Sequence, residues 1–160
     1  MRGGALPAAL LCCSLGLALA CAPRRAWAPS LFALALTACV SAAAPLPKAW
    51  ADLMFSGCWL SVITCTCAVY RQRGIGFGAA VALSANVGIW CGGVITVAGS
   101  PSNLLEALPC VSAVMIAAPA RHRMPIAVQV LSSWLIAIAL LAATLQVIPV
   151  TPGYVPDHIE

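Results

Sequence analysis

The sequence contains few charged residues. Of its 160 residues, eight are Lys or Arg and four are Asp or Glu, so only 8% of the chain is charged. A soluble domain carries about 25% charged residues on average. Twelve charged side chains cannot cover the surface of a soluble protein of this length, and 62% of the residues are hydrophobic, with a mean hydropathy of +1.01. The composition therefore indicates an integral membrane protein.

Histidine and carboxylate residues are also scarce, which argues against several kinds of site. The two histidines, His122 and His158, lie in a predicted loop and in a polar C-terminal tail. A haem held by two membrane histidines is therefore excluded, and a buried zinc site with three protein ligands is not expected. The sequence also lacks a visible His, Asp and Ser set for acyl transfer and a P-loop. We therefore expect a non-enzymatic protein without a cofactor or a metal site.

Nine cysteines are present, but their spacing does not predict disulfide bonds or a metal site. Most of them lie inside apolar segments, no C-x-x-C pair occurs, and Cys65 and Cys67 are separated by a single residue. Cysteine in apolar surroundings behaves as a small hydrophobic residue. We expect buried thiols at helix contacts. The alternative is an intramembrane enzyme with Cys65 or Cys67 as the reactive group, although no base for it is visible.

Long apolar segments, separated by short polar breaks, are abundant. Six of them cover residues 3–22, 27–44, 52–70, 74–99, 103–120 and 125–148, and a polar tail follows at 149–160. Each is close to the roughly 20 residues that cross the hydrocarbon core, and backbone groups in lipid must be satisfied within a helix. We predict an all-α bundle of about six transmembrane helices in three hairpins, forming one membrane domain over residues 1–160. The first segment could instead be a secretory signal peptide, although its end is a poor cleavage site.

Arginine pairs recur in three alternate breaks between these segments. The six residues are Arg24, Arg25, Arg71, Arg73, Arg121 and Arg123. Short loops rich in Lys and Arg remain in the cytoplasm, so we predict that both termini lie outside it. The arginines could also bind anionic lipid headgroups. The high alanine content and the short loops favour a bacterial inner membrane.

A glycine motif opens the fourth segment. Residues 73–80 read RGIGFGAA, and Gly74, Gly76 and Ala79 have the spacing G-x-G-x-x-A found in dinucleotide-binding proteins. That motif requires a preceding strand and an acidic residue about 20 residues later. Here an apolar helix precedes it, and no acidic residue occurs between Asp52 and Glu106. A nucleotide site is therefore not expected.

Close helix packing explains the glycines of the fourth segment better. Gly74 with Gly78, and Gly88 with Gly92, form two G-x-x-x-G steps. Small residues at these positions allow the backbones of two membrane helices to approach closely. We therefore expect the fourth helix at the centre of the bundle or at a subunit contact.

Two acidic residues near the predicted membrane ends have structural explanations. Asp52 follows Lys48 by four residues at the start of the third helix, where an ion pair and the helix dipole both favour it. Glu106 follows Asn103 by three residues, which is the spacing of a capping box. Neither residue requires a functional role.

A few polar residues could line a path through the bundle. They are Asn86, Ser100, Asn103, Glu106 and Gln129. Hydrogen bonding between helices is the simpler role for such residues. Ion-coupled and other carriers, however, often place their sites beside helices interrupted by Gly or Pro.

Two functions are compatible with these features of the sequence. The first is a small non-catalytic membrane protein, either an accessory subunit or a self-associating scaffold. The alternative is a small oligomeric transporter or channel with a polar path near Asn86, Gln129 and the 100–106 loop. The expected partners are the lipid bilayer and either further copies of the chain or a larger membrane complex. Nucleic acid is not expected, because membrane topology explains the net charge of +4.

Overall fold

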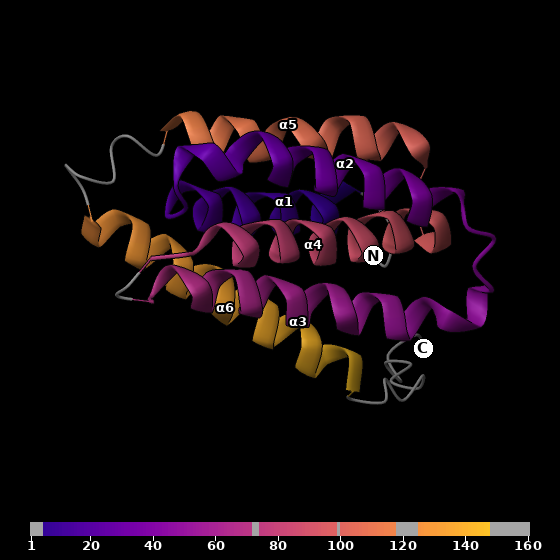
Figure 1. Cartoon of the computed structure of the whole chain (residues 1–160). Helices are drawn as coiled ribbons and strands as arrows, with labels where there is room; N and C mark the ends of the chain where they lie inside the picture. Colours follow the sequence, from indigo (N-terminus) through magenta and orange to yellow (C-terminus); the bar gives the residue numbers. More distant parts are fainter. Residues whose placement is uncertain (1–4, 72–73, 99, 118–124, 148–160) are drawn as a thin grey trace, which may run out of the picture.

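The computed structural model describes residues 5–71, 74–98, 100–117 and 125–147, which form a bundle of α-helices (Figure 1). The helices are α1 (Ala5–Ala20), α2 (Trp27–Ala43), α3 (Ala51–Val69), α4 (Phe77–Ala98), α5 (Pro101–Ala117) and α6 (Pro125–Val147). Short 3-10 turns, η1 (Arg24–Ala26) and η2 (Lys48–Trp50), precede α2 and α3. No strand occurs among the described residues. The predicted all-α bundle is confirmed, and the helices begin and end within three residues of the expected bounds.

Four helical segments are long and apolar enough to cross a membrane. They are Arg24–Ala43, Lys48–Val69, Phe77–Ala98 and Val128–Leu145. The 16 residues of α1 extend about 24 Å at 1.5 Å per residue, which is less than the hydrocarbon thickness. The 17 residues of α5 include Pro109 inside the helix. By length and composition, the chain is membrane-embedded.

The helices pack in an order that differs from their order along the chain. The most extensive contacts join α2 to α4 and α1 to α5, followed by those that join α3 to α1 and to α6. Of the consecutive helices, α3 and α4 also pack on each other, and they are the pair that forms the candidate site. In Figure 1, α6 runs at an angle to the other helices and diverges from α3 toward its C-terminal end. Most of the packing therefore joins helices of different hairpins, and α3 with α4 is the hairpin whose two helices also pack on each other.

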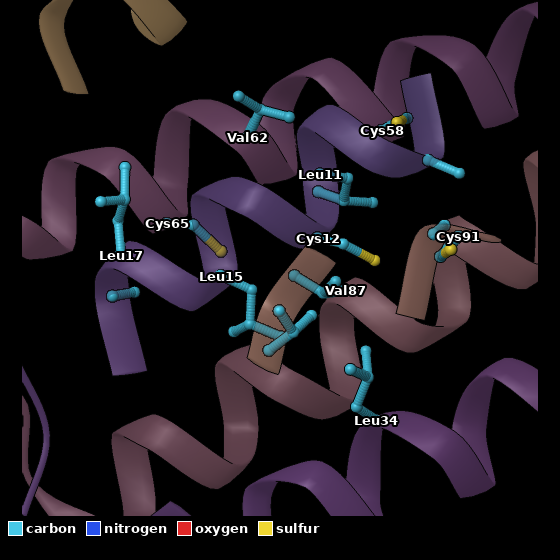
Figure 2. Close-up of a cluster of buried hydrophobic side chains, with 14 of the residues drawn as sticks. Leu11, Cys12, Leu15, Leu17, Leu34, Cys58, Val62, Cys65, Val87 and Cys91 are labelled. Carbon is cyan, nitrogen blue, oxygen red and sulfur yellow. The ribbon is translucent and has the colours of Figure 1, made fainter. Parts of the chain in front are cut away.

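The centre of the bundle is shared by α1 and α4. Figure 2 shows α1 between α3 and α4, with side chains from all three helices meeting in one cluster. Its fully buried members include Leu11, Cys12, Leu15, Cys58, Val62, Cys65, Val87 and Cys91. The four cysteines of this cluster are buried among apolar side chains, as expected. The fourth helix contacts α1, α2, α3 and α5, which agrees with its predicted central position.

Gly88 and Gly92 lie where α2 and α4 approach each other most closely. A Cβ added to Gly88 would lie 2.6 Å from the carbonyl oxygen of Leu34. A Cβ added to Gly92 would overlap the carbonyl oxygen of Ala38. These glycines therefore allow backbone-to-backbone contact, the role that small residues have in membrane helices.

Hydroxyl groups add hydrogen bonds across the same interface. The Ser41 hydroxyl on α2 donates to the Ile89 carbonyl on α4 at 2.8 Å. The Thr96 hydroxyl on α4 lies 3.3 Å from the carbonyls of Ser41 and Ala42. The interface between α2 and α4 thus combines close backbone packing with interhelical hydrogen bonds.

The other predicted glycine step is not formed within this chain. Gly74 precedes α4 in a turn, with φ of +72°, and its N–H donates to the Arg71 carbonyl at 3.0 Å. Only glycine adopts this backbone conformation without strain. Nothing lies within 4 Å of a Cβ added to Gly78. Gly74 therefore serves the turn, and Gly78 lies on an exposed part of α4.

Two contacts place the ends of α1 and α3 and the starts of α4 and α6 at one end of the bundle. The Ile75 N–H donates to the Cys21 carbonyl at 3.5 Å, which joins the turn before α4 to the end of α1. The Tyr70 hydroxyl donates to the Gln129 carbonyl at 2.8 Å, which joins the end of α3 to the start of α6. Figure 1 shows the corresponding helix ends together on the left.

The arginines described by the structure follow the alternation predicted from the loops. Arg24, Arg25 and Arg71 are exposed and lie at this common end. Lys48 and Asp52, in η2 and the first turn of α3, lie at the opposite end. The predicted residues Arg73, Arg121 and Arg123 lie outside the described residues.

Candidate functional site

A hollow of about 440 Å³ lies between α3 and α4. Its lining residues are Gly57, Leu60, Ser61, Thr64, Ala79, Ala82, Leu83, Asn86 and Trp90. The residues on α3 have the spacing i, i+3, i+4 and i+7, which places them on one face of the helix. Leu60, Thr64, Ala79 and Ala82 are exposed, so the hollow opens sideways, away from the bundle.

An amide at the wall of the hollow is held by residues of both helices. The Nδ2 group of Asn86 donates to Oγ of Ser61 on α3 at 2.6 Å. The indole Nε1–H of Trp90 donates to Oδ1 of Asn86 at 3.0 Å. A side-chain amide offers two N–H donors and two acceptor positions, and these two bonds use one of each. The half-buried amide therefore retains one N–H and one acceptor position at the wall of the hollow.

Trp90 closes one end of the hollow because α3 has a glycine there. A Cβ added to Gly57 would overlap ring carbon atoms of the Trp90 indole. The Trp90 ring can lie at this position only because residue 57 has no side chain. Asn86 and Trp90 are four residues apart, so both side chains lie on the same face of α4.

A second hollow of about 270 Å³ continues toward the end of the bundle that carries the arginines. It shares Thr64, Ala79 and Leu83 with the first hollow, and it reaches Arg71 and Ile75. Ser61 and Arg71 are ten residues apart, which corresponds to about 15 Å along α3. Together the two hollows form one groove, which we call the α3–α4 groove.

The polar residues predicted to line a path lie at different levels of the bundle. Asn86 is in the α3–α4 groove, whereas Gln129 is exposed near the start of α6, where its carbonyl accepts the Tyr70 hydroxyl. Ser100 follows α4, fourteen residues or about 21 Å beyond Asn86, and its hydroxyl is hydrogen-bonded to that of Ser102 at 2.5 Å. The structure does not bring Asn86, Gln129 and Ser100 together.

The remaining predicted path residues, Asn103 and Glu106, belong to α5. Their side chains lie outside what the structure describes.

Gly57, Ser61 and Trp90, which surround Asn86 at the inner end of the groove, were not predicted from the sequence as site residues. The spacing of Asn86 and Trp90 was a usable signal, because residues at i and i+4 on a helix are neighbours. The pairing of Ser61 with Asn86 had no such signal, because it depends on which faces of α3 and α4 meet.

The chemistry available in the groove suits binding. The lining residues offer an amide, an indole, hydroxyl groups, the thiol of Cys67, apolar side chains and one guanidinium. Cys67, one of the two cysteines considered as a reactive group, thus lines the groove, but none of these lining residues is a carboxylate or a histidine that could act as its base. No known protein family, curated protein or solved structure matches this chain. Its function is therefore inferred from the geometry of the groove and from the membrane character of the helices.

Proposed function

We propose that this chain is a non-enzymatic integral membrane protein that binds a membrane-dissolved molecule in the α3–α4 groove. One observation carries the proposal: the amide of Asn86, fixed by Ser61 and Trp90, forms part of the wall of a laterally open hollow. Polar side chains in membrane helices usually bond to neighbouring helices. Here the amide of Asn86 keeps one N–H and one acceptor position beside a hollow that a ligand can enter from the lipid.

The position of Asn86 along α4 supports a carrier or binding role. Asn86 follows Phe77, the first residue of α4, by nine residues, or about 14 Å, and is thus near the middle of the helix. Substrate sites of membrane transporters lie near the midplane of the bilayer. The groove opens toward lipid, which suits a ligand dissolved in the membrane better than a hydrated ion.

The orientation of the protein is part of the proposal. Arg24, Arg25 and Arg71 share one end of the bundle, and clustered arginines in short connections favour the cytoplasmic side. We therefore place this end in the cytoplasm, with the protein in a bacterial inner membrane. The groove then extends from the cytoplasmic surface to the middle of the membrane.

A self-associating scaffold or accessory subunit is the second candidate, and one observation favours it. Gly78, Ala79 and Ala82 present small exposed residues on α4, and Gly78 has open space beside it. Close contact with a helix of another molecule requires such a surface. In that case the helix, and not a small molecule, would occupy the α3–α4 groove.

Photoaffinity labelling in the membrane tests the proposed function. A neutral alkyl probe with a hydrogen-bonding oxygen and a diazirine in its chain is added to the full chain in lipid nanodiscs, and its adducts are mapped by mass spectrometry. We expect adducts concentrated on the residues that line the groove. Ala82→Phe should remove most of this labelling because the ring fills the hollow.

Leu36→Phe is the matched control for this experiment, because Leu36 is exposed on α2, away from the groove. It should leave the labelling unchanged. Adducts spread evenly over all exposed helix faces, and unaffected by Ala82→Phe, would reject the binding role. Native mass spectrometry of the same sample would then report whether a second copy is present.

A further inference from the structure

We infer that the ligand of the α3–α4 groove is an anionic amphiphile whose charged group binds Arg71 and whose chain extends along the groove toward Asn86. This inference rests on the proposed function and adds the chemical class of the ligand. It combines three features of the groove: its continuity, the guanidinium of Arg71 at its outer end and the amide of Asn86 at its inner end.

The groove is continuous from the end of the bundle to the middle of the helices. Thr64, Ala79 and Leu83 line both hollows, so no wall of the protein separates them. Between the two ends, the lining is mostly apolar, with Leu60, Leu83 and Ile75 among its larger side chains. A hydrocarbon chain is the natural occupant of this stretch.

Among the described residues, Arg71 is the only charged one that lines the two hollows. It is exposed, so its guanidinium can reach a group at the membrane surface. A guanidinium binds phosphate or carboxylate through two parallel hydrogen bonds. Asp52, the acidic residue described on α3, is nineteen residues or about 28 Å away along the helix, too far to neutralise this site.

The inner end of the groove is polar. A plain hydrocarbon tail would meet the Asn86 amide there and would leave its remaining N–H without a partner, which is costly in an apolar environment. A hydroxyl, carbonyl or ether oxygen on the ligand would satisfy it. The spacing of Ser61 and Arg71 sets the distance between this oxygen and the charged group at about 15 Å.

Charge favours an amphiphile over a helix from a second copy. Two copies inserted in the same orientation place their arginine ends at the same membrane surface. A helix of the second copy lying in the groove would therefore bring like charges toward Arg71, and like charges in close proximity repel each other. An anionic amphiphile instead supplies the opposite charge at that position.

Two probes with the same chain test the inference. Both carry a diazirine and an oxygen about 15 Å from the headgroup, and one ends in a phosphate monoester, whereas the other ends in phosphocholine. In nanodiscs of uncharged lipid, we expect the phosphate probe to label the groove about tenfold more efficiently at equal concentration. Because the guanidinium is exposed, added salt should reduce this preference.

Arg71→Gln should abolish the preference for the phosphate probe while retaining labelling by the phosphocholine probe. Arg25→Gln is the matched control, since Arg25 is exposed at the same end but does not line the groove, and it should retain the preference. Thermal melting of each variant checks that the bundle is intact.

Each result has a defined meaning. Equal labelling by both probes, or a preference that survives Arg71→Gln, overturns the anionic ligand and leaves the binding role intact. An equal loss in Arg25→Gln and Arg71→Gln also overturns it, because general attraction to a basic surface would then explain the preference. If neither probe labels the groove and cross-links join two copies there, both the inference and the proposed function fail.

Discussion

The indole of Trp90 on α4 lies in the space that a side chain at Gly57 on α3 would occupy. This position allows the indole N–H to reach Asn86, which in turn reaches back to Ser61 on α3. Only a glycine at position 57 leaves room for the Trp90 ring, and so for the hydrogen bonds that join Trp90, Asn86 and Ser61 at the inner end of the groove.

Gly57→Ala should displace the Trp90 ring. Overpacking a filled site costs about 1–3 kcal/mol of stability. The added Cβ would overlap three ring atoms of Trp90, so we expect a cost in the upper part of this range, above the gain of about 1 kcal/mol from replacing Gly by Ala in a helix. The free energy of unfolding should fall, and the fluorescence of Trp90 should change because its hydrogen bond to Asn86 is broken. Equilibrium unfolding in mixed micelles and emission spectra measure the two effects.

Gly78→Ala is the control, because nothing lies within 4 Å of the added methyl group. It should be neutral or slightly stabilising. Since the obstructing group at position 57 is a side chain, Trp90→Ala in the Gly57→Ala background should relieve the clash. A Gly57→Ala protein as stable as Gly78→Ala would contradict the packing of Trp90 on Gly57.

Gly92→Ala should destabilise the protein, and shortening a neighbouring side chain should not restore its stability. The added Cβ would overlap the backbone carbonyl oxygen of Ala38, so α2 and α4 must separate. We expect a loss toward the upper end of about 1–3 kcal/mol in the same unfolding assay. Ala38→Gly should give no rescue, because it leaves the carbonyl in place. Full rescue by Ala38→Gly would show that the α2–α4 approach is wrong.

The helices could be predicted from the sequence because their length and apolar content follow directly from the solvent properties of the bilayer. Gly88 and Gly92 were also predictable, since their four-residue spacing marks one face of a helix. Gly74 has the same spacing to Gly78, but it lies in the turn before α4, where it supplies a positive φ. Spacing alone does not show where a helix begins.

The groove could not be predicted from the sequence, because it depends on which helix faces meet. Asn86 was predicted to line a polar path, but its partner Ser61 is 25 residues away on another helix. Pairing of helices that are not consecutive, such as α2 with α4 and α1 with α5, has no periodic signal in one sequence. It is set by complementarity between helix surfaces that are all largely apolar.

The hydrogen bond between Asn86 and Ser61 should have a measurable coupling energy. A double-mutant cycle with Asn86→Leu and Ser61→Ala should give about 0.6–1.7 kcal/mol, which spans the average and the maximum for hydrogen bonds between membrane helices. The control cycle combines Asn86→Leu with Thr64→Val. Thr64 also lines the groove, but its hydroxyl donates to the Leu60 carbonyl of its own helix at 2.8 Å and not to Asn86. That cycle should show no coupling, and equal coupling in the two cycles would count against the Asn86–Ser61 contact.

The single lysine of the chain provides a test of orientation. Lys48 is exposed in η2, at the end of the bundle opposite to Arg71. If the arginine end is cytoplasmic, a membrane-impermeant amine reagent added to spheroplasts should modify Lys48 without permeabilisation. In an Arg71→Lys variant, the new lysine should be modified only after the membrane is permeabilised, and peptide mapping separates the two positions. The reverse pattern would place the arginine end, and with it the charged mouth of the α3–α4 groove, on the outer side of the membrane.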